Sequence, residues 1–106
     1  MLNPPAVVRI GDSLSTGHLC DTTTTIGSTP QSTVKANGIL IAVVGALTSL
    51  HFWPDPACVP HVGPPYPKLN AGSSTVRIEG IAVGRIGDSA DLGAMTTGSP
   101  NVFVGD

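Results

Sequence analysis

The sequence predicts a small all-β domain made of short hairpins, and three observations support this prediction. Glycine occupies 13 and proline 10 of the 106 positions, about one residue in five against about one in eight on average. Hydrophobic residues reach 41% while charged residues make up only 11%, a composition too apolar for a disordered chain. The apolar residues come in short runs that end at glycine, without the Ala, Glu, Lys and Leu excess that long helices need.

Charge and hydropathy exclude several kinds of partner. The net charge is −2 and the five lysine and arginine residues are scattered, so no basic patch is expected and we predict no binding to nucleic acid. The longest apolar stretch, Ile39–Leu50, is shorter than the roughly 20 residues of a membrane-spanning helix, so no transmembrane segment is expected. The first residues have neither a basic region nor an apolar core, and export through the general secretory route is not expected.

The chain contains three copies of one sequence pattern. A run of apolar residues that ends at glycine, followed in two cases by aspartate, occurs in three segments: Ala6–Ser13, Gly38–Ala46 and Ile81–Ser89. Each run is followed later by a Gly-Ser segment that leads into a valine: Gly27–Val34, Gly72–Val76 and Gly98–Val102. We therefore treat residues 1–106 as one domain with repeats at roughly 6–37, 38–79 and 80–105.

The repeats contain the elements of β-hairpins. The segments Val34–Ala36 and Val76–Glu79 alternate apolar and polar residues, as half-buried strands do. Asn37-Gly38 and Glu79-Gly80 supply the positive φ that a two-residue hairpin turn needs. The next apolar run returns as the second strand and ends at a glycine. The aspartates that follow this glycine in the first and third repeats are expected to cap the turn.

Histidine and cysteine gather in the loops that follow the repeat turns, which predicts a metal site. The candidates are His18, Cys20, His51, Cys58 and His61. Zinc is held by four ligands in a tetrahedron, usually thiolates and imidazoles, and separate loops of a repeat can converge on one ion. A Cys20–Cys58 disulfide and free buried cysteines remain as alternatives, although no secretion signal indicates an oxidising compartment. Prolines crowd the loop of the second repeat and stiffen it for binding.

The sequence offers no catalytic arrangement, so the protein is predicted not to be an enzyme. The carboxylates near the candidate ligands, Asp21, Asp55 and Asp91, do not fall in H-E-x-x-H or a comparable motif. No G-x-S-x-G nucleophile motif is present, and the Thr22–Thr25 run is predicted to be an extended polar strand.

The repeated combination of Arg-Ile-Gly-Asp with Gly-Ser-x-x-Val resembles the PAAR-repeat family. Gly80–Asp88 looks like the signature of that family, and Gly98–Gly105 is similar to its usual ending. The resemblance covers the chain from about Ala6 to Gly105. It implies a cone of β-hairpins with three-fold pseudo-symmetry, whose base sits on the blunt end of a trimeric β-helical spike. It also implies a metal at the sharp tip, typically zinc, bound by three histidines and one cysteine.

The resemblance also implies which residues are the ligands. The three histidines are His18, His51 and His61. In many family members the cysteine follows the third Gly-Asp turn, where this chain has Leu92, a residue that cannot bind metal. The fourth ligand is therefore expected to be Cys58, because it shares a C-x-x-H segment with His61. Cys20 and then Asp91 are the alternatives. One structural zinc ion is expected, with iron as the alternative metal.

The function that the resemblance implies is a non-enzymatic tip that caps a trimeric spike protein, one chain per trimer, and pierces the envelope of a target cell. Because these residues include no toxin domain, a contractile phage tail is expected before a type VI secretion spike. The expected location is the virion, at the tip of the baseplate spike, or otherwise the cytoplasm before export by the injection machine. A freestanding zinc-stabilised binding module is the competing prediction. Phe52 and Trp53 are expected to shield the metal or to pack on the base of the loop, and Val102–Val104 to form a strand of the base or of a sheet.

Overall fold

The computed structural model describes residues 4–105 as an all-β chain, with no helix in that range. Residues 1–3 and 106, at the two ends of the predicted domain, lie outside it. Five short strands form one antiparallel sheet in the order β10 (Ser89–Ala90), β11 (Gly93–Met95), β1 (Ser13–Ser15), β2 (Thr23–Ser28) and β5 (Leu47–Thr48). The predicted all-β class is confirmed. Among the described residues there is no helix able to cross a membrane.

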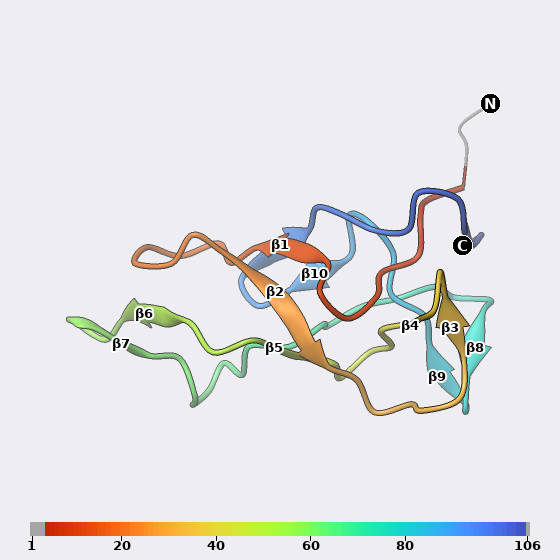
Figure 1. The fold of residues 1–106 in the computed structure, drawn as a ribbon. Helices are drawn as coiled ribbons and strands as arrows, with labels where there is room; N and C mark the ends of the chain where they lie inside the picture. Colours follow the sequence, from red (N-terminus) through yellow and green to blue (C-terminus); the bar gives the residue numbers. More distant parts are fainter. Residues whose placement is uncertain (1–3, 106) are drawn as a thin grey trace.

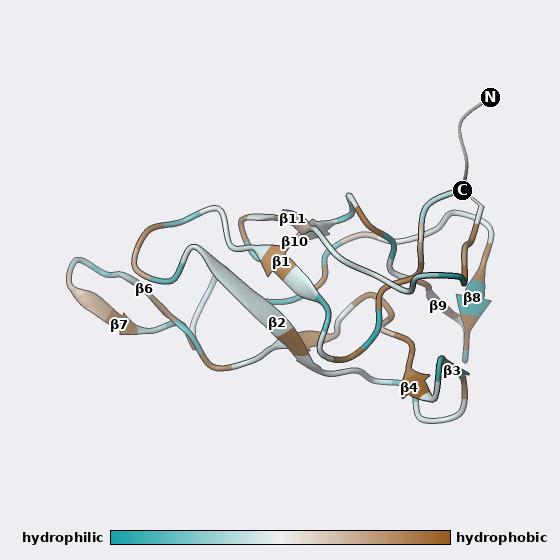
Figure 2. Ribbon diagram, turned by 45° about the horizontal axis from the view of Figure 1, so that its top comes forward, coloured by the Kyte–Doolittle hydropathy of each residue, from teal (hydrophilic) through white to brown (hydrophobic). Residues whose placement is uncertain are grey.

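Six further strands pair into three two-stranded antiparallel ladders. They are β3 (Lys35–Ala36) with β4 (Ile39–Leu40), β6 (Phe52–Pro54) with β7 (Cys58–Pro60), and β8 (Arg77–Ile78) with β9 (Ile81–Ala82). In Figures 1 and 2 the β3–β4 and β8–β9 ladders lie together at one end of the molecule, which we call the proximal end. The β6–β7 ladder lies at the opposite end, which we call the distal end.

The two hairpins predicted from the sequence form the proximal end. Asn37 and Gly38 join β3 to β4 with φ of 58° and 76°. Glu79 and Gly80 join β8 to β9 with φ of 52° and 80°. Positive φ at both central residues defines a type I′ turn, whose twist matches that of the paired strands. The prediction of these two hairpins is confirmed.

The two ends of the chain form a third extended pair of the same kind. Phe103 bridges Ala6 in antiparallel fashion, and the Val104 amide donates to the Pro5 carbonyl at 3.0 Å. The strand of the third repeat is therefore completed by the beginning of the first repeat, without a connecting turn.

Backbone hydrogen bonds link the three apolar runs in a closed cycle. The Val8 amide donates to the Gly84 carbonyl, the Gly84 amide to the Ala42 carbonyl, and the Ala42 amide to the Val8 carbonyl, at 2.9, 2.9 and 2.8 Å. The residues two positions further along each run form a second set of three bonds between the runs. The amides of Ile10, Val44 and Ile86 donate to the carbonyls of Leu40, Ala82 and Ala6, respectively. Each run is thus bonded to both of the others, and the three segments close around a common centre.

Each apolar run ends in the same turn, with a glycine at positive φ in its third position: Gly11, Gly45 and Gly87. In the first repeat, Asp12 Oδ2 accepts from the Arg9 amide at 2.8 Å and from its Nε at 3.1 Å. Asp88 holds Arg85 in the same way in the third repeat. The hydrogen bond to Asp12 raises the pKa of Arg9 above its usual value. The predicted turn-capping role of these two aspartates is confirmed.

Two clusters of buried side chains make up the core. One packs against the five-stranded sheet and contains Val8, Leu14, Ile26, Ala42, Ala46, Leu69, Ala90 and Met95. The other lies toward the proximal end and contains Val7, Ala36, Ile41, Val43, Ile78 and Val83. Neighbours in one run, such as Val7 and Val8, enter different clusters because side chains alternate along an extended segment. This explains why the runs are apolar at nearly every position.

Candidate metal centre

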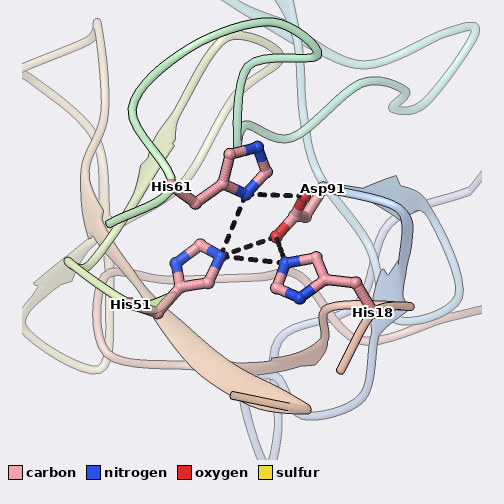
Figure 3. A group of neighbouring side chains, drawn as sticks. All are labelled: His18, His51, His61 and Asp91. Carbon is pink, nitrogen blue, oxygen red and sulfur yellow. Dashed lines mark hydrogen bonds and ion pairs between the residues drawn. The ribbon is translucent and has the colours of Figure 1, made fainter. Parts of the chain in front are cut away.

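Four side chains from four segments meet where the five-stranded sheet approaches the β6–β7 ladder. They are His18, His51, His61 and Asp91 (Figure 3). One ligand atom from each lies within 4.8 Å of the others. His18 is partly buried and the other three are buried. The structure therefore brings together the three histidines that the sequence singled out, and adds a carboxylate.

His51 and His61 face each other at the foot of the β6–β7 ladder. The register pairs Phe52 with Pro60, so the two histidines form the next pair, and the His61 amide donates to the His51 carbonyl at 2.9 Å. Because side chains alternate along a strand, this pair shares one face of the ladder with Trp53. The Trp53 ring stacks on His61, with centroids 3.9 Å apart and planes at 12°. The indole therefore covers one face of this imidazole, whereas Phe52 points to the other face of the ladder and is 42% exposed.

His18 lies in the loop that joins β1 to β2. Thr16, which is fully buried, organises this loop. Its hydroxyl donates to the Asp21 carbonyl at 2.7 Å, and its amide donates to the Thr22 carbonyl at 2.9 Å. The His18 ring then lies parallel to that of His51, with centroids 5.2 Å apart.

Asp91 lies in the turn between β10 and β11, with a φ of 52°. Its amide donates to the Lys68 carbonyl at 2.8 Å, and Asn70 Nδ2 donates to its carbonyl at 3.0 Å. Gly17, the neighbour of His18, packs directly on this turn: a Cβ there would overlap the Leu92 carbonyl and lie 2.8 Å from the Gly93 nitrogen. The His18 loop and the Asp91 turn are thus in backbone contact, which fixes two ligands relative to each other.

Each imidazole is oriented by a hydrogen bond to a backbone carbonyl. The pairs are His18 Nδ1 with Leu19, His51 Nδ1 with Ser49 and His61 Nε2 with Pro65, at 2.9, 3.0 and 2.6 Å. A carbonyl oxygen only accepts, so these three ring nitrogens are the donors. In a neutral imidazole the second nitrogen then carries a lone pair. All three lone pairs point into the centre of the group.

The carboxylate of Asp91 faces these lone pairs. Its Oδ2 is 3.0 Å from His18 Nε2 and 2.8 Å from His51 Nε2. Its Oδ1 is 3.5 Å from His61 Nδ1, is buried, and has no hydrogen-bond partner. Acceptor atoms that converge in a buried site are unfavourable unless a cation lies among them, and a buried oxygen without a partner has a free-energy cost. These nitrogen and oxygen atoms are therefore suited to bind a metal ion.

The distances agree with four-fold coordination. Metal–ligand bonds of about 2.0–2.1 Å in a regular tetrahedron put the ligand atoms about 3.3 Å apart. His51 Nε2 is 3.3 Å from both His18 Nε2 and His61 Nδ1. Asp91 Oδ2 is 2.8 Å from His51 Nε2 and 3.0 Å from His18 Nε2, somewhat less than this value, and the four ligand atoms all lie within 4.8 Å of one another. These three histidines and Asp91 can hold one metal ion with protein atoms at all four positions.

The expected role of Cys58 is corrected by the structure, which joins Cys58 to Cys20 in a disulfide. Neither sulfur belongs to the group that can hold a metal, and Asp91, the last of the alternatives, is the fourth member of that group. The expectation took two ligands from the Cys58-x-x-His61 segment, but Cys58–Pro60 is strand β7. Residues three apart on a strand point to opposite faces, so Cys58 faces away from the ligand side of the ladder.

Comparisons with protein-family models and with curated proteins give no match to this sequence. The fold and the site define the molecule as an all-β domain with a centre of three histidines and one aspartate that can hold a metal ion.

Proposed function

We propose that this protein is a PAAR-repeat-like tip that caps a trimeric β-helical spike of a contractile phage tail or a related injection machine. The observation that carries the proposal is the closed cycle of backbone hydrogen bonds through Val8, Ala42 and Gly84. In the proposed pseudo-three-fold cone, such a cycle gives one chain three similar faces. A trimeric spike presents three identical faces around its axis, so a single chain can match all of them at once.

The proximal end is the proposed base that contacts the spike. The β3–β4 hairpin, the β8–β9 hairpin and the paired chain ends all belong to this end. Val34, Ile39 and Phe103 are exposed by 41%, 38% and 52%. These side chains supply apolar surface beside short ladders whose free edges can continue the strands of a partner. Val102–Val104, expected to form a strand, contributes an isolated bridge from Phe103 to Ala6 at this end.

The distal end is the proposed tip that meets the target envelope. Each metal ligand has an exposed aliphatic neighbour in the sequence: Leu19, Leu50, Val62 and Leu92, exposed by 72%, 73%, 72% and 48%. Between Leu47 and Pro67 the only charged side chain is Asp55. Figure 2 shows hydrophobic colour on β7 at this end. Since charged groups are costly to remove from water, a surface with few of them suits passage into an apolar layer.

The bound metal is proposed to be one zinc ion, with iron as the alternative, in a structural role. Four protein ligands fill a tetrahedral zinc site and leave no position for water or substrate, which supports a non-enzymatic function. Binding of structural zinc contributes on the order of 10 kcal/mol of folding free energy. That contribution is large for a chain of 106 residues with a small core.

The test is co-assembly with a trimeric β-helical spike, measured by native mass spectrometry, together with metal analysis of the purified chain. We expect one chain per spike trimer and one zinc or iron per chain. Phe103→Asp at the proposed base should abolish assembly, while Leu50→Asp at the distal end is the matched control and should retain it. A chain that stays monomeric beside the spike with its metal bound would contradict the capping role and favour a freestanding binding module. A fully folded chain without metal would contradict the metal-stabilised tip.

A further inference from the structure

We infer that the Cys20–Cys58 disulfide positions the metal ligands, so that the affinity for the metal depends on whether these two cysteines are oxidised. The inference rests on the metal centre of the proposed function but not on the spike. The disulfide connects the β1–β2 loop, which carries His18, to strand β7, which leads into His61. It therefore ties together two segments that supply ligands.

The ligands and the disulfide lie on opposite faces of the β6–β7 ladder. Cys58 precedes His61 by three residues, about 10 Å along an extended strand, and points to the other face. Cys20 follows His18 by two residues. The loop therefore crosses the edge of the ladder. On one face the planes of the His18 and His51 rings are within 9° of parallel, and on the other face Cys20 is bonded to Cys58.

Besides the contacts of the His18 ring with His51, His61 and Trp53, this loop is hydrogen-bonded to the ladder through Asp21 and Phe52. The Asp21 amide donates to the Phe52 carbonyl at 3.1 Å, and the Phe52 amide donates to Asp21 Oδ2 at 2.7 Å. The second bond is exposed to solvent, where water competes for the same groups. The side chain of Leu19 is 72% exposed and adds little apolar packing. The covalent bond is thus the strongest restraint on the position of His18 relative to His51 and His61.

The metal and the disulfide close overlapping loops of the chain. The two cysteines are separated by 38 residues, a segment that contains His51 and is flanked by His18 and His61. Once one of the two links has formed, the second no longer has to overcome the full entropy of bringing these segments together. The closure entropy of a loop of 38 residues sets the upper limit of the coupling at about a thousandfold in affinity. We expect a factor between about ten and this limit.

Thermodynamic linkage requires the same factor in both directions. If oxidation tightens metal binding, metal binding must favour the disulfide over the dithiol by an equal ratio. Reduction of the disulfide takes up two electrons and two protons from two glutathione molecules, which form one glutathione disulfide. The dithiol–disulfide equilibrium in a glutathione buffer, with and without zinc, therefore measures the coupling a second time.

The experiment is a cobalt(II) and zinc(II) titration of the isolated chain in three forms: oxidised wild type, wild type reduced with a phosphine, and the Cys20→Ser/Cys58→Ser variant. Tetrahedral cobalt absorption reports the site, and the fluorescence of Trp53, the sole tryptophan, reports binding at His61. The oxidised form should bind at least about tenfold more tightly than the serine variant. Zinc should shift the glutathione equilibrium toward the disulfide by the matching factor, and His61→Ala should remove that shift.

Each outcome has a distinct meaning. Equal metal affinity in the oxidised form and in the serine variant would overturn the inference and leave the metal centre intact. Tighter binding by the reduced wild type than by both other forms would also overturn it, because a thiolate would then be acting as a ligand. Absence of metal binding in all three forms would instead refute the metal centre of the proposed function.

Discussion

Replacement of Gly17 by alanine should weaken metal binding without removing a ligand. Gly17 has a φ of +76°, and its Cα packs on the turn that carries Asp91. An added Cβ would overlap the carbonyl group of Leu92, the residue next to Asp91. The turn must then move away from the His18 loop, and the Asp91 carboxylate moves with it.

The expected losses of stability and of metal affinity follow from two separate effects of this Cβ. A non-glycine residue at such a φ costs about 1–2 kcal/mol. Overpacking against a neighbour typically costs about 1–3 kcal/mol more, so the free energy of unfolding of the metal-free chain should fall by about 2–5 kcal/mol. Relief of the overlap requires a shift of roughly 1 Å, which exceeds the roughly 0.2 Å tolerance of metal–ligand distances. We therefore expect metal affinity to fall by about 10–100-fold or more, as it does when the groups that orient metal ligands are removed.

Gly38→Ala is the matched control. Gly38 has the same φ of +76°, but no atom lies within 4 Å of the position of its Cβ. The free energy of unfolding of this variant should fall only by the backbone cost of about 1–2 kcal/mol, and the variant should bind cobalt as tightly as the wild type. Chemical unfolding monitored by circular dichroism and cobalt titration monitored by absorption measure both quantities. If Gly17→Ala bound cobalt as tightly as Gly38→Ala, the contact between Gly17 and the Asp91 turn would not position the ligand, and our account of the site would be wrong.

Three further predictions address the centre and the repeat turns. His51→Ala should reduce the bound metal, measured by elemental analysis, from one ion per chain to almost none, because Nε2 of His51 lies 3.3 Å from two other ligand atoms. Retention of the metal would exclude the assigned ligand set. A strong chelator should lower the melting temperature markedly, since structural zinc contributes on the order of 10 kcal/mol; an unchanged melting curve would argue against a structural role. Asp88→Ala should lower the free energy of unfolding by denaturant by about 1–3 kcal/mol, because the amide and the Nε of Arg85 lose Asp88 as an acceptor. The fold should persist, since the second repeat forms the same turn with Ala46 in place of aspartate, and loss of folding would refute this.

Local features of the fold could be predicted because their causes lie within a few residues. The Asn37-Gly38 and Glu79-Gly80 turns follow from residues that tolerate positive φ between alternating strands. The aspartate caps follow from a carboxylate placed directly after the glycine that ends an apolar run. The grouping of His18, His51 and His61 could be expected because each follows a repeat turn, and loops at equivalent positions of a repeat reach a common place.

The fourth ligand and the disulfide could not be predicted in the same way. Thiolates are more common zinc ligands than carboxylates, so the sequence favours Cys58 over Asp91. In the structure this preference is not followed, because side chains alternate along strand β7 and Cys58 therefore points to the face opposite His61. The sequence did contain one signal for Asp91, since this residue follows the third repeat turn as His18 follows the first. The sequence left a Cys20–Cys58 disulfide open as an alternative, but nothing local indicates that Cys20 reaches Cys58, 38 residues away.

The sequence by itself determined the all-β class, the repeat pattern, the hairpin turns and the three histidines, because backbone preference and periodicity act over short distances. Only the tertiary structure decided which acid joins the three histidines, whether the two cysteines pair and how the three apolar runs bond in a cycle. These features depend on which faces of separate segments meet, and that is fixed by the packing of the whole chain.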